Sequence, residues 1–227
     1  MGRLLFLAVF GVTGFVVLIA LGTWQVQRLE WKQAILAEID SRLTAEPVDL
    51  PEAPEPEIDR YLPVAVAGEM RQGEVHVLVS TRDFGAGYRI IAPFETETGR
   101  RIMVDRGFVP TEAKDAERPL GAMRIEGNLH WPQEVDSYTP EADPARNIWF
   151  AREVPVLAAQ LGTEPVLLIA RTPTAPDVTP LPVDSAGIPN DHLQYAITWF
   201  GLAAVWAVMT GYFLWRPGRR RDDERAT

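Results

Sequence analysis

Cysteine is absent from this sequence, and histidine and serine are scarce, with three and four residues respectively. The lack of cysteine excludes structural disulfides, thiolate metal sites, cysteine-based copper carriers and covalent c-type haem attachment. Neither His76 nor His130 begins a metal-ligand spacing, so we expect strand-surface or core positions for both. No serine lies in a nucleophile-elbow context. Asp105, next to Arg106, has no partner base and is predicted to make a structural ion pair or turn contact. The sequence therefore predicts no enzyme.

Positive charge is also limited, because the formal net charge is −9. Arg3 contributes one positive charge, and residues 216–227 contribute five positive and three negative charges. Residues 22–191 therefore carry −12. An acidic central region argues against nucleic acid as a partner and against binding of anionic lipid through a basic surface.

The most informative stretch is residues 189–215, which has no formal charge between Asp191 and Arg216. As a helix it spans about 30 Å of hydrocarbon, so residues 191–215 are predicted to be transmembrane. Asn190 and Asp191 are suited to an N-cap. The far end is marked by a basic stop and should face the cytoplasm or its mitochondrial equivalent. This stop consists of Arg216, Arg219, Arg220 and Arg221.

A second apolar run covers residues 4–21. A cleaved signal peptide is the alternative, but the run exceeds the usual core of about 7–15 residues, which favours a retained span over residues 4–23. With two spans, residues 1–3 and 216–227 are predicted to be cytoplasmic. No Arg-rich and Ser-rich presequence precedes the first span, which favours a bacterial inner membrane with the central domain in the periplasm.

The predicted fold class is a membrane protein with two transmembrane α-helices flanking a β-rich α+β extramembrane domain. The segments between the spans are a helical extension at 24–43, an acidic proline-rich tether at 44–60, the β-rich domain at 61–171 and a second proline-rich tether at 172–190. Strands are predicted at 62–70, 74–80, 88–97, 101–108, 123–130 and 166–170. One helix is expected at 153–161, ending at Gly162, and a hairpin turn at Thr98 and Gly99.

Two lines of side chains follow the second span at helical spacing. The aromatic-rich line contains His192, Tyr195, Trp199, Leu202, Trp206, Met209 and Phe213. Ala203, Ala207 and Gly211 form a line of small residues, which we expect to pack against Gly11 and Gly14 of the first span. His192 lies at the membrane boundary, where a neutral imidazole suits a haem iron. The alternative is an interfacial histidine that contacts only headgroups and water.

Aromatic and basic residues also mark the place where the first span leaves the membrane. Trp24 and Trp31 are typical interface anchors. Arg28 and Lys32 lie at the same depth as His192 in this prediction. Their partners are either lipid phosphates or the propionates of a haem.

Three separated blocks resemble the Surfeit locus protein 1 family of cytochrome c oxidase assembly factors. They are residues 21–25 (LGTWQ) with Arg28, Trp31 and Lys32; Thr98 and Gly99 with residues 104–110 (VDRGFVP); and Asn190 with His192, Leu193, Tyr195, Ala196 and residues 198–200 (TWF). The resemblance covers nearly the whole chain in one order. Two positions depart from it, because Asp105 stands where the family usually has Asn and Phe108 where it usually has Trp.

The resemblance implies an assembly factor that binds haem a transiently and hands it to the catalytic subunit of cytochrome c oxidase. His192 would be an axial ligand of the haem iron, Tyr195 and Trp199 would flank the porphyrin, and Arg28 and Trp24 would complete the site. Haem a synthase is a second candidate partner, besides membrane lipid. The alternative is a cofactor-free scaffold that stabilises an oxidase assembly intermediate.

Overall fold

A computed structural model describes residues 2–185 and 188–223, with backbone alone for residue 3 and residues 216–223. Contacts divide the chain into a helical unit, residues 1–38 with 186–227, and a second unit, residues 39–185. The predicted basic stop after Trp215 has side chains outside the described part. Each unit is taken separately below.

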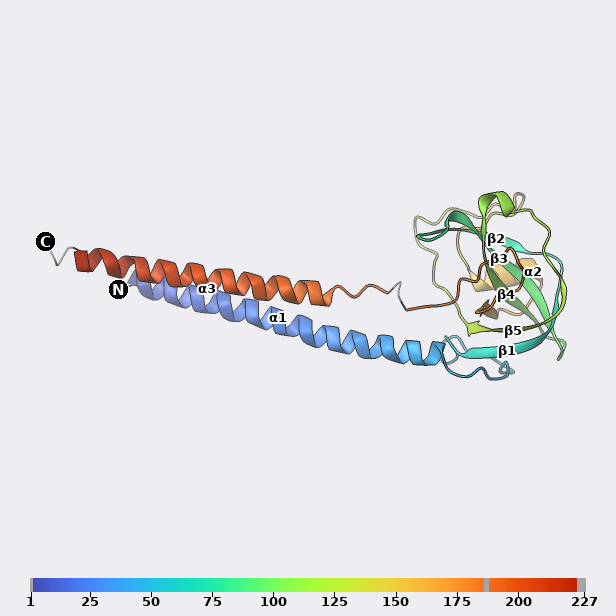
Figure 1. Ribbon diagram of the computed structural model, residues 1–227, viewed down its shortest axis with the longest axis horizontal. Helices are drawn as coiled ribbons and strands as arrows, with labels where there is room; N and C mark the ends of the chain where they lie inside the picture. Colours follow the sequence, from blue (N-terminus) through green and yellow to red (C-terminus); the bar gives the residue numbers. More distant parts are fainter. Residues whose placement is uncertain (1, 186–187, 224–227) are drawn as a thin grey trace. The chain divides into compact units, whose positions relative to one another are not determined.

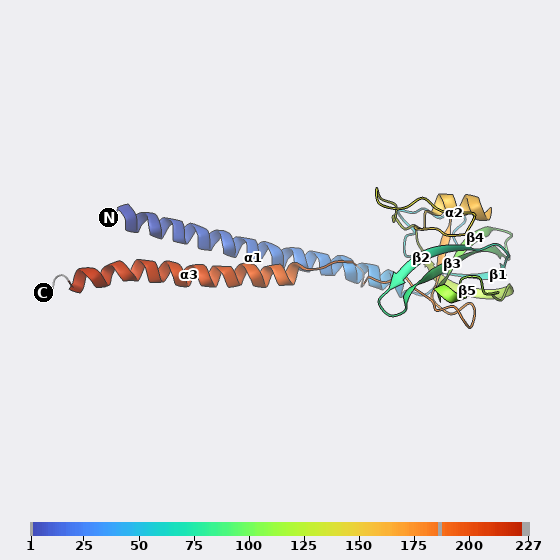
Figure 2. The ribbon, with the colours of Figure 1, turned by 90° about the horizontal axis from the view of Figure 1, so that it is seen from above.

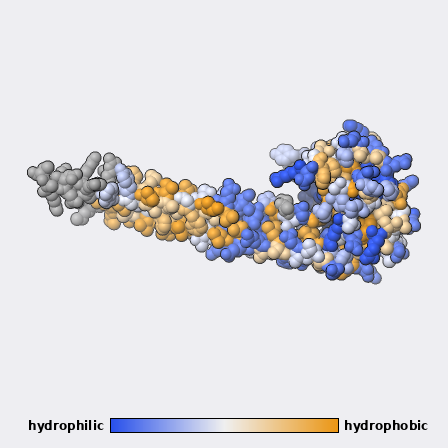
Figure 3. Space-filling model, in the orientation of Figure 1, coloured by the Kyte–Doolittle hydropathy of each residue, from blue (hydrophilic) through white to orange (hydrophobic). Residues whose placement is uncertain are grey.

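The helical unit is built from two long helices, α1 (Gly2–Leu43) and α3 (His192–Asp223). Both are long and apolar enough to cross a membrane, over Leu4–Leu43 and His192–Trp215. The first half of α1 lies beside α3 with opposite chain direction (Figures 1 and 2). Apolar side chains cover this paired region in the space-filling view (Figure 3), as expected for helices that face lipid. The prediction of two apolar helices at the ends of the chain is confirmed.

Small residues of α1 form the seam between the two helices. Cβ atoms added at Gly11 and Gly14 would overlap the side chains of Thr210 and Trp206. The indole N–H of Trp206 donates a hydrogen bond of 2.8 Å to the Gly11 carbonyl. The predicted packing role of the two glycines is therefore confirmed, but their partners differ from those predicted.

On α3 the seam is shifted relative to the predicted line of small residues. Ala203 is buried, whereas Ala207 is exposed and Gly211 has no atom within 4 Å of an added Cβ. Large side chains of α3 instead fill the space that the glycines of α1 leave open. The prediction was wrong for Ala207 and Gly211 because it assumed small residues on both sides of the contact.

The second unit is a small mixed β-barrel. Its elements are β1 (Pro63–Met70), β2 (Val75–Thr81), β3 (Gly85–Thr96), β4 (Arg101–Pro110), a 3-10 turn η1 (Thr111–Ala113), β5 (Gly121–Leu129), α2 (Val154–Leu161) and β6 (Leu167–Ala170). The sheet order is β1-β5-β6-β4-β3-β2, and an additional pairing of β1 with β3 closes the ring. Among these six strands, β4 and β6 are the one pair that runs parallel. All six predicted strands and the one predicted helix are present.

Alternation along the strands separates two apolar clusters. Ile102, Val104 and Leu168 belong to the cluster inside the barrel, whereas Met103 and Leu167 belong to the cluster beneath α2. Because side chains alternate between the faces of a strand, β4 and β6 are buried on both sides. α2 covers the outer face and ends where Gly162 adopts a left-handed conformation with φ of 63°.

Short bridges from loops cover the remaining strand edges. Val48 pairs with Val64 of β1, Trp149 pairs with Val77 of β2, and Thr179 pairs with Phe108 of β4. The last two are each held by two backbone hydrogen bonds of 2.7–3.0 Å. Segments outside the strands therefore supply additional backbone partners to β1, β2 and β4.

A β-bulge interrupts β4 opposite Ile90 and Ile91. The register passes from Gly107 to Asp105, so Arg106 is the extra residue. Gly107 has φ of 118°, and an added Cβ would overlap the Thr179 carbonyl. The Arg106 side chain is fully buried and donates hydrogen bonds to Thr174 and to the Pro119 carbonyl. The bulge thus explains the Arg-Gly pair in the VDRGFVP block.

Candidate functional site

His192 is the first residue of α3, and one hydrogen bond fixes its orientation. Its Nδ1 lies 2.8 Å from Oε1 of Gln25 on α1. Gln25 is only 8% exposed, so its amide is held in the contact between the two helices. His192 itself is half-buried and sits one residue after Asp191, whose carbonyl accepts the Tyr195 N–H. The site therefore combines a rigid imidazole with partial access.

This hydrogen bond selects the tautomer of the neutral ring. An amide oxygen accepts only, so Nδ1 of His192 must carry the proton. The lone pair is then on Nε2, which has no hydrogen-bond partner within residues 2–185 and 188–223. Histidines that bind metals typically donate their second ring N–H to such an acceptor, which fixes both tautomer and ring orientation. The pair of Gln25 and His192 shows the same arrangement, with Nδ1 bonded and Nε2 free of partners in the described part of the chain.

No hydrogen bond, ion pair or ring contact joins the side chains of the other predicted site residues to His192 in the described part of the chain. Tyr195 and Trp24 are 55% exposed, whereas Trp199 is half-buried. The Arg28 guanidinium stacks over the ring of Trp31, 3.8 Å from its centroid. Arg28 is therefore held on α1 by a cation–π contact with a neighbour of its own helix.

The sequence indicated Gln25 only as a member of the LGTWQ block and predicted no role for it. A signal for it existed, because a buried amide between apolar residues of a membrane helix needs a hydrogen-bond partner. The partner could not be identified, since it lies 167 residues away. No group of three or more potential metal-ligating residues occurs in the described part of the chain.

The polar residues of the barrel form a separate, structural cluster. Asp105 is fully buried and accepts hydrogen bonds from Arg89 at 2.6 Å and Arg152 at 3.4 Å. Its other oxygen accepts the Gly107 N–H at 3.1 Å. Arg152 also pairs with Glu134. The predicted ion pair and turn contact are both present, but the ion pair is with Arg89 and Arg152 and not with the adjacent Arg106.

Contacts within the cluster favour the charged forms of Arg152 and Glu134 despite burial. Burial lowers the pKa of Arg152, but the hydrogen bond to Glu134 and the charge of Asp105 outweigh it, so the pKa lies above its ordinary value. Burial raises the pKa of Glu134, but the hydrogen bonds with Arg152 and the charges of Arg152 and Arg89 together outweigh this effect, so its pKa is lowered. With two cations and two anions, the cluster is balanced and offers no free acid or base.

His76 occupies a core position of the barrel and His130 a half-buried position directly after β5, within the expected range of strand-surface or core positions. His76 is 4% exposed and its Nε2 lies 2.9 Å from Glu74. His130 stacks on Tyr61, and its Nδ1 is buried without a hydrogen-bond partner in the described part of the chain. Neither histidine has the surroundings of a metal ligand.

Acid should destabilise the barrel through His130. Burial, followed by the charges of Arg152 and Arg60, lowers the pKa of His130 from 6.5 to about 4. Between these values the unfolded chain binds a proton that the folded chain does not. The free energy of unfolding should therefore decrease as the pH is lowered below 6.5, by at most about 1.4 kcal/mol per pH unit. This loss should level off once the pH is below the pKa of the folded state. Urea unfolding at pH 7.5, 6 and 5 should show a flatter dependence for His130→Gln. Equal slopes in the two proteins would contradict this assignment.

These features define a class of protein: a small mixed β-barrel carried between two long apolar helices, with one oriented histidine at the start of the second. Residues 12–204 match the SURF1 family. Surfeit locus protein 1 of Rattus norvegicus is 33% identical over 224 residues, covering 88% of this chain and 72% of that protein. The protein of that name from Homo sapiens is 32% identical over 210 residues, covering 82% and 70%. A SURF1-like protein of Monosiga brevicollis is 32% identical over 232 residues, covering 93% and 88%.

The chain therefore belongs to the SURF1 family, known as cytochrome oxidase assembly factors and generally not enzymes. The resemblance inferred from three sequence blocks is confirmed.

Proposed function

We propose that this protein binds haem a through His192 and hands it to the catalytic subunit of cytochrome c oxidase. The observation that carries the proposal is the hydrogen bond between Gln25 and Nδ1 of His192, which leaves the lone pair of Nε2 available to bind the iron. A second observation supports it: Tyr195, one turn beyond His192, is exposed and available to a flat ligand. Haem a supplies the redox and oxygen chemistry of the oxidase, so here it is cargo.

The other residues of the proposed site hold the cargo by ordinary contacts. Tyr195 and Trp199 would lie against the porphyrin, and Trp24 would border it from α1. Arg28 would pair with a propionate. Its contact with Trp31 keeps the guanidinium on an exposed face of α1, where a propionate could reach it. One protein ligand to the iron suits a carrier, because moderate affinity permits release to a recipient.

The proposed location is a bacterial inner membrane, with both termini in the cytoplasm and the barrel in the periplasm. Lipid would surround the two helices, and haem a synthase would be the donor of the cargo. The test is to co-express the chain with haem o and haem a synthases, purify it in mild detergent and record reduced-minus-oxidised spectra. We expect a haem a band in the wild type and its loss in His192→Ala. A band retained in His192→Ala would sink the ligand assignment, and colourless wild-type protein would leave the cofactor-free scaffold as the better hypothesis.

Gln25 should govern how well the site retains haem. Removing the partner of a ligating histidine typically costs about 10–100-fold in affinity, so Gln25→Leu should retain about tenfold less haem or worse after gel filtration. Gln25→Glu keeps a hydrogen-bond acceptor for Nδ1 and makes the imidazole donate more electron density to the iron. This variant should therefore retain haem, and the midpoint potential of that haem should be more negative. The matched control is Gln27→Leu, two residues along α1 at an exposed position. Equal retention in the Gln25 and Gln27 leucine variants would show that the hydrogen bond is not functional.

A further inference from the structure

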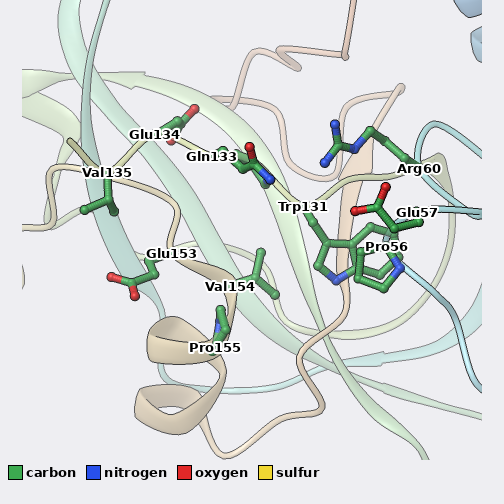
Figure 4. Close-up of a pocket in the computed structure, with 11 residues that line it drawn as sticks. Pro56, Glu57, Arg60, Trp131, Gln133, Glu134, Val135, Glu153, Val154 and Pro155 are labelled. Carbon is green, nitrogen blue, oxygen red and sulfur yellow. The ribbon is translucent and has the colours of Figure 1, made fainter.

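The surface of the barrel around Trp131 is hollowed into a groove. Two hollows of about 400 Å³ each adjoin there, and both are lined by Pro56, Trp131, Val154 and Pro155. Figure 4 shows the first hollow, with Trp131 and Pro56 on one side and the start of α2 on the other. Because the two hollows share these four residues, they belong to one groove. We call it the Trp131 groove.

The walls of the groove are apolar and poor in backbone donors. Five prolines line it: Pro54, Pro56, Pro132, Pro155 and Pro165. Trp131 packs against both apolar clusters of the barrel, and its indole N–H is already bonded to the Pro165 carbonyl at 2.9 Å. Its ring is thus fixed in place. Val135, at the edge of the first hollow, is 56% exposed. Fixed aromatic and proline surfaces of this kind are what proline-rich, extended peptides dock against.

The groove is also acidic. Five glutamates line it, of which Glu134 pairs with Arg152 and Glu164 pairs with Arg100. The other three, Glu52, Glu57 and Glu153, form no ion pair with any residue in the described part of the chain. Arg60 is the one cation among the described lining residues. The groove therefore has an excess of unpaired negative charge and would attract a cation.

We propose that the Trp131 groove binds an extended segment of a partner protein, with proline or other apolar residues next to a lysine or arginine. The apolar residues would lie against Trp131 and the prolines, and the basic side chain would meet Glu52 or Glu57. The presence of two adjoining hollows favours a peptide chain that can enter both over a compact ligand. The excess of negative charge disfavours nucleic acid and acidic peptides. The groove lies wholly within residues 52–166 and involves none of the proposed haem-binding residues.

The test is a selection on the full chain in lipid nanodiscs, using an mRNA-display library of random 12-residue peptides and empty nanodiscs for subtraction. We expect the enriched peptides to carry lysine or arginine beside proline or apolar residues. They should bind Glu52→Lys/Glu57→Lys at least about tenfold more weakly, as expected for reversing two charges at an interface. Trp131→Phe, which keeps most of the packing but loses the bond to Pro165, should also weaken binding.

The matched control is Glu112→Lys/Glu117→Lys, which reverses two exposed glutamates outside the groove and should bind as the wild type does. Circular dichroism of every variant would establish that the barrel is folded. Failure to enrich any peptide over empty nanodiscs would overturn the proposal. So would enriched peptides without basic residues, or equal binding to the wild type and to Glu52→Lys/Glu57→Lys. None of these outcomes depends on haem, so they are independent of the spectroscopic test.

Discussion

Replacing Asp105 with alanine should lower the free energy of unfolding of the barrel by about 3–5 kcal/mol, the usual cost of removing one partner from a buried ion pair. Asp105 is fully buried, and its carboxylate compensates Arg89 and Arg152, which are only 14% and 12% exposed in their side chains. After the substitution Arg152 keeps Glu134, but Arg89 loses its only ion-pair partner in the described part of the chain. Urea unfolding of the full chain in detergent, followed by near-ultraviolet circular dichroism, would measure the loss.

Two further variants separate the charge of Asp105 from its hydrogen bonding. Asp105→Asn keeps an acceptor for the Gly107 N–H but loses the charge, so it should fall between the wild type and the alanine variant. Asp115→Ala removes an aspartate that pairs with Lys114 in solvent, and it should leave the unfolding midpoint unchanged. If Asp105→Ala were as stable as Asp115→Ala, the buried cluster would not stabilise the barrel.

The second large effect is expected at Gly107, where alanine should cost about 3 kcal/mol or more. Its φ of 118° lies outside the region that residues with a Cβ readily adopt, and the added carbon would also overlap the Thr179 carbonyl. Relief of that overlap would require breaking the bridge between Phe108 and Thr179. We therefore expect a loss of stability together with faster protease cleavage near Thr179, measured by limited proteolysis with mass spectrometry.

Gly99 provides the matched comparison for Gly107. It also has positive φ, 81°, but nothing lies within 4 Å of an added Cβ. Gly99→Ala should therefore cost about 1–2 kcal/mol from backbone conformation alone. The difference between the two variants measures the close approach of Thr179, and equal losses would show that backbone conformation accounts for both.

Local patterns in the sequence predicted the elements of this fold well. Alternation at Val64 and Val66 gave the buried face of β1, and Gly162 marked the end of α2 because it can adopt a left-handed conformation. The two uncharged runs predicted the helices, since length and hydropathy suffice for that purpose. Each of these signals lies within a few residues of the structure it predicts.

Features that depend on distant pairs could not be predicted in the same way. The pairing of β1 with β3 that closes the barrel, the contact of Asp105 with Arg152 and the bond of Gln25 to His192 each join segments far apart in the chain. Composition and periodicity contain no information on which partner is chosen. The bulge at Arg106 was hidden for a related reason, because a one-residue register shift leaves the apolar pattern of both strands almost intact.

The two departures from the family pattern also take on a physical meaning. Phe108 is 4% exposed and stacks on Phe84, with ring centroids 5.4 Å apart. Asp105 is fully buried among arginines. Both side chains are therefore buried, and both make their contacts with residues of the second unit. Neither side chain is itself exposed at the surface of the barrel.

The bridges at Val48, Trp149 and Thr179 protect the barrel from unwanted strand pairing with other proteins. An assembly factor acts on newly synthesised chains that are not yet fully folded. An unpaired strand edge would form backbone hydrogen bonds with such chains without regard to their sequence. Here loops of the same molecule already occupy β1, β2 and β4. Strand exchange between crowded copies, or with an unfinished client, is disfavoured as a result. Recognition of a client then depends on side-chain contacts, which can be specific and reversible.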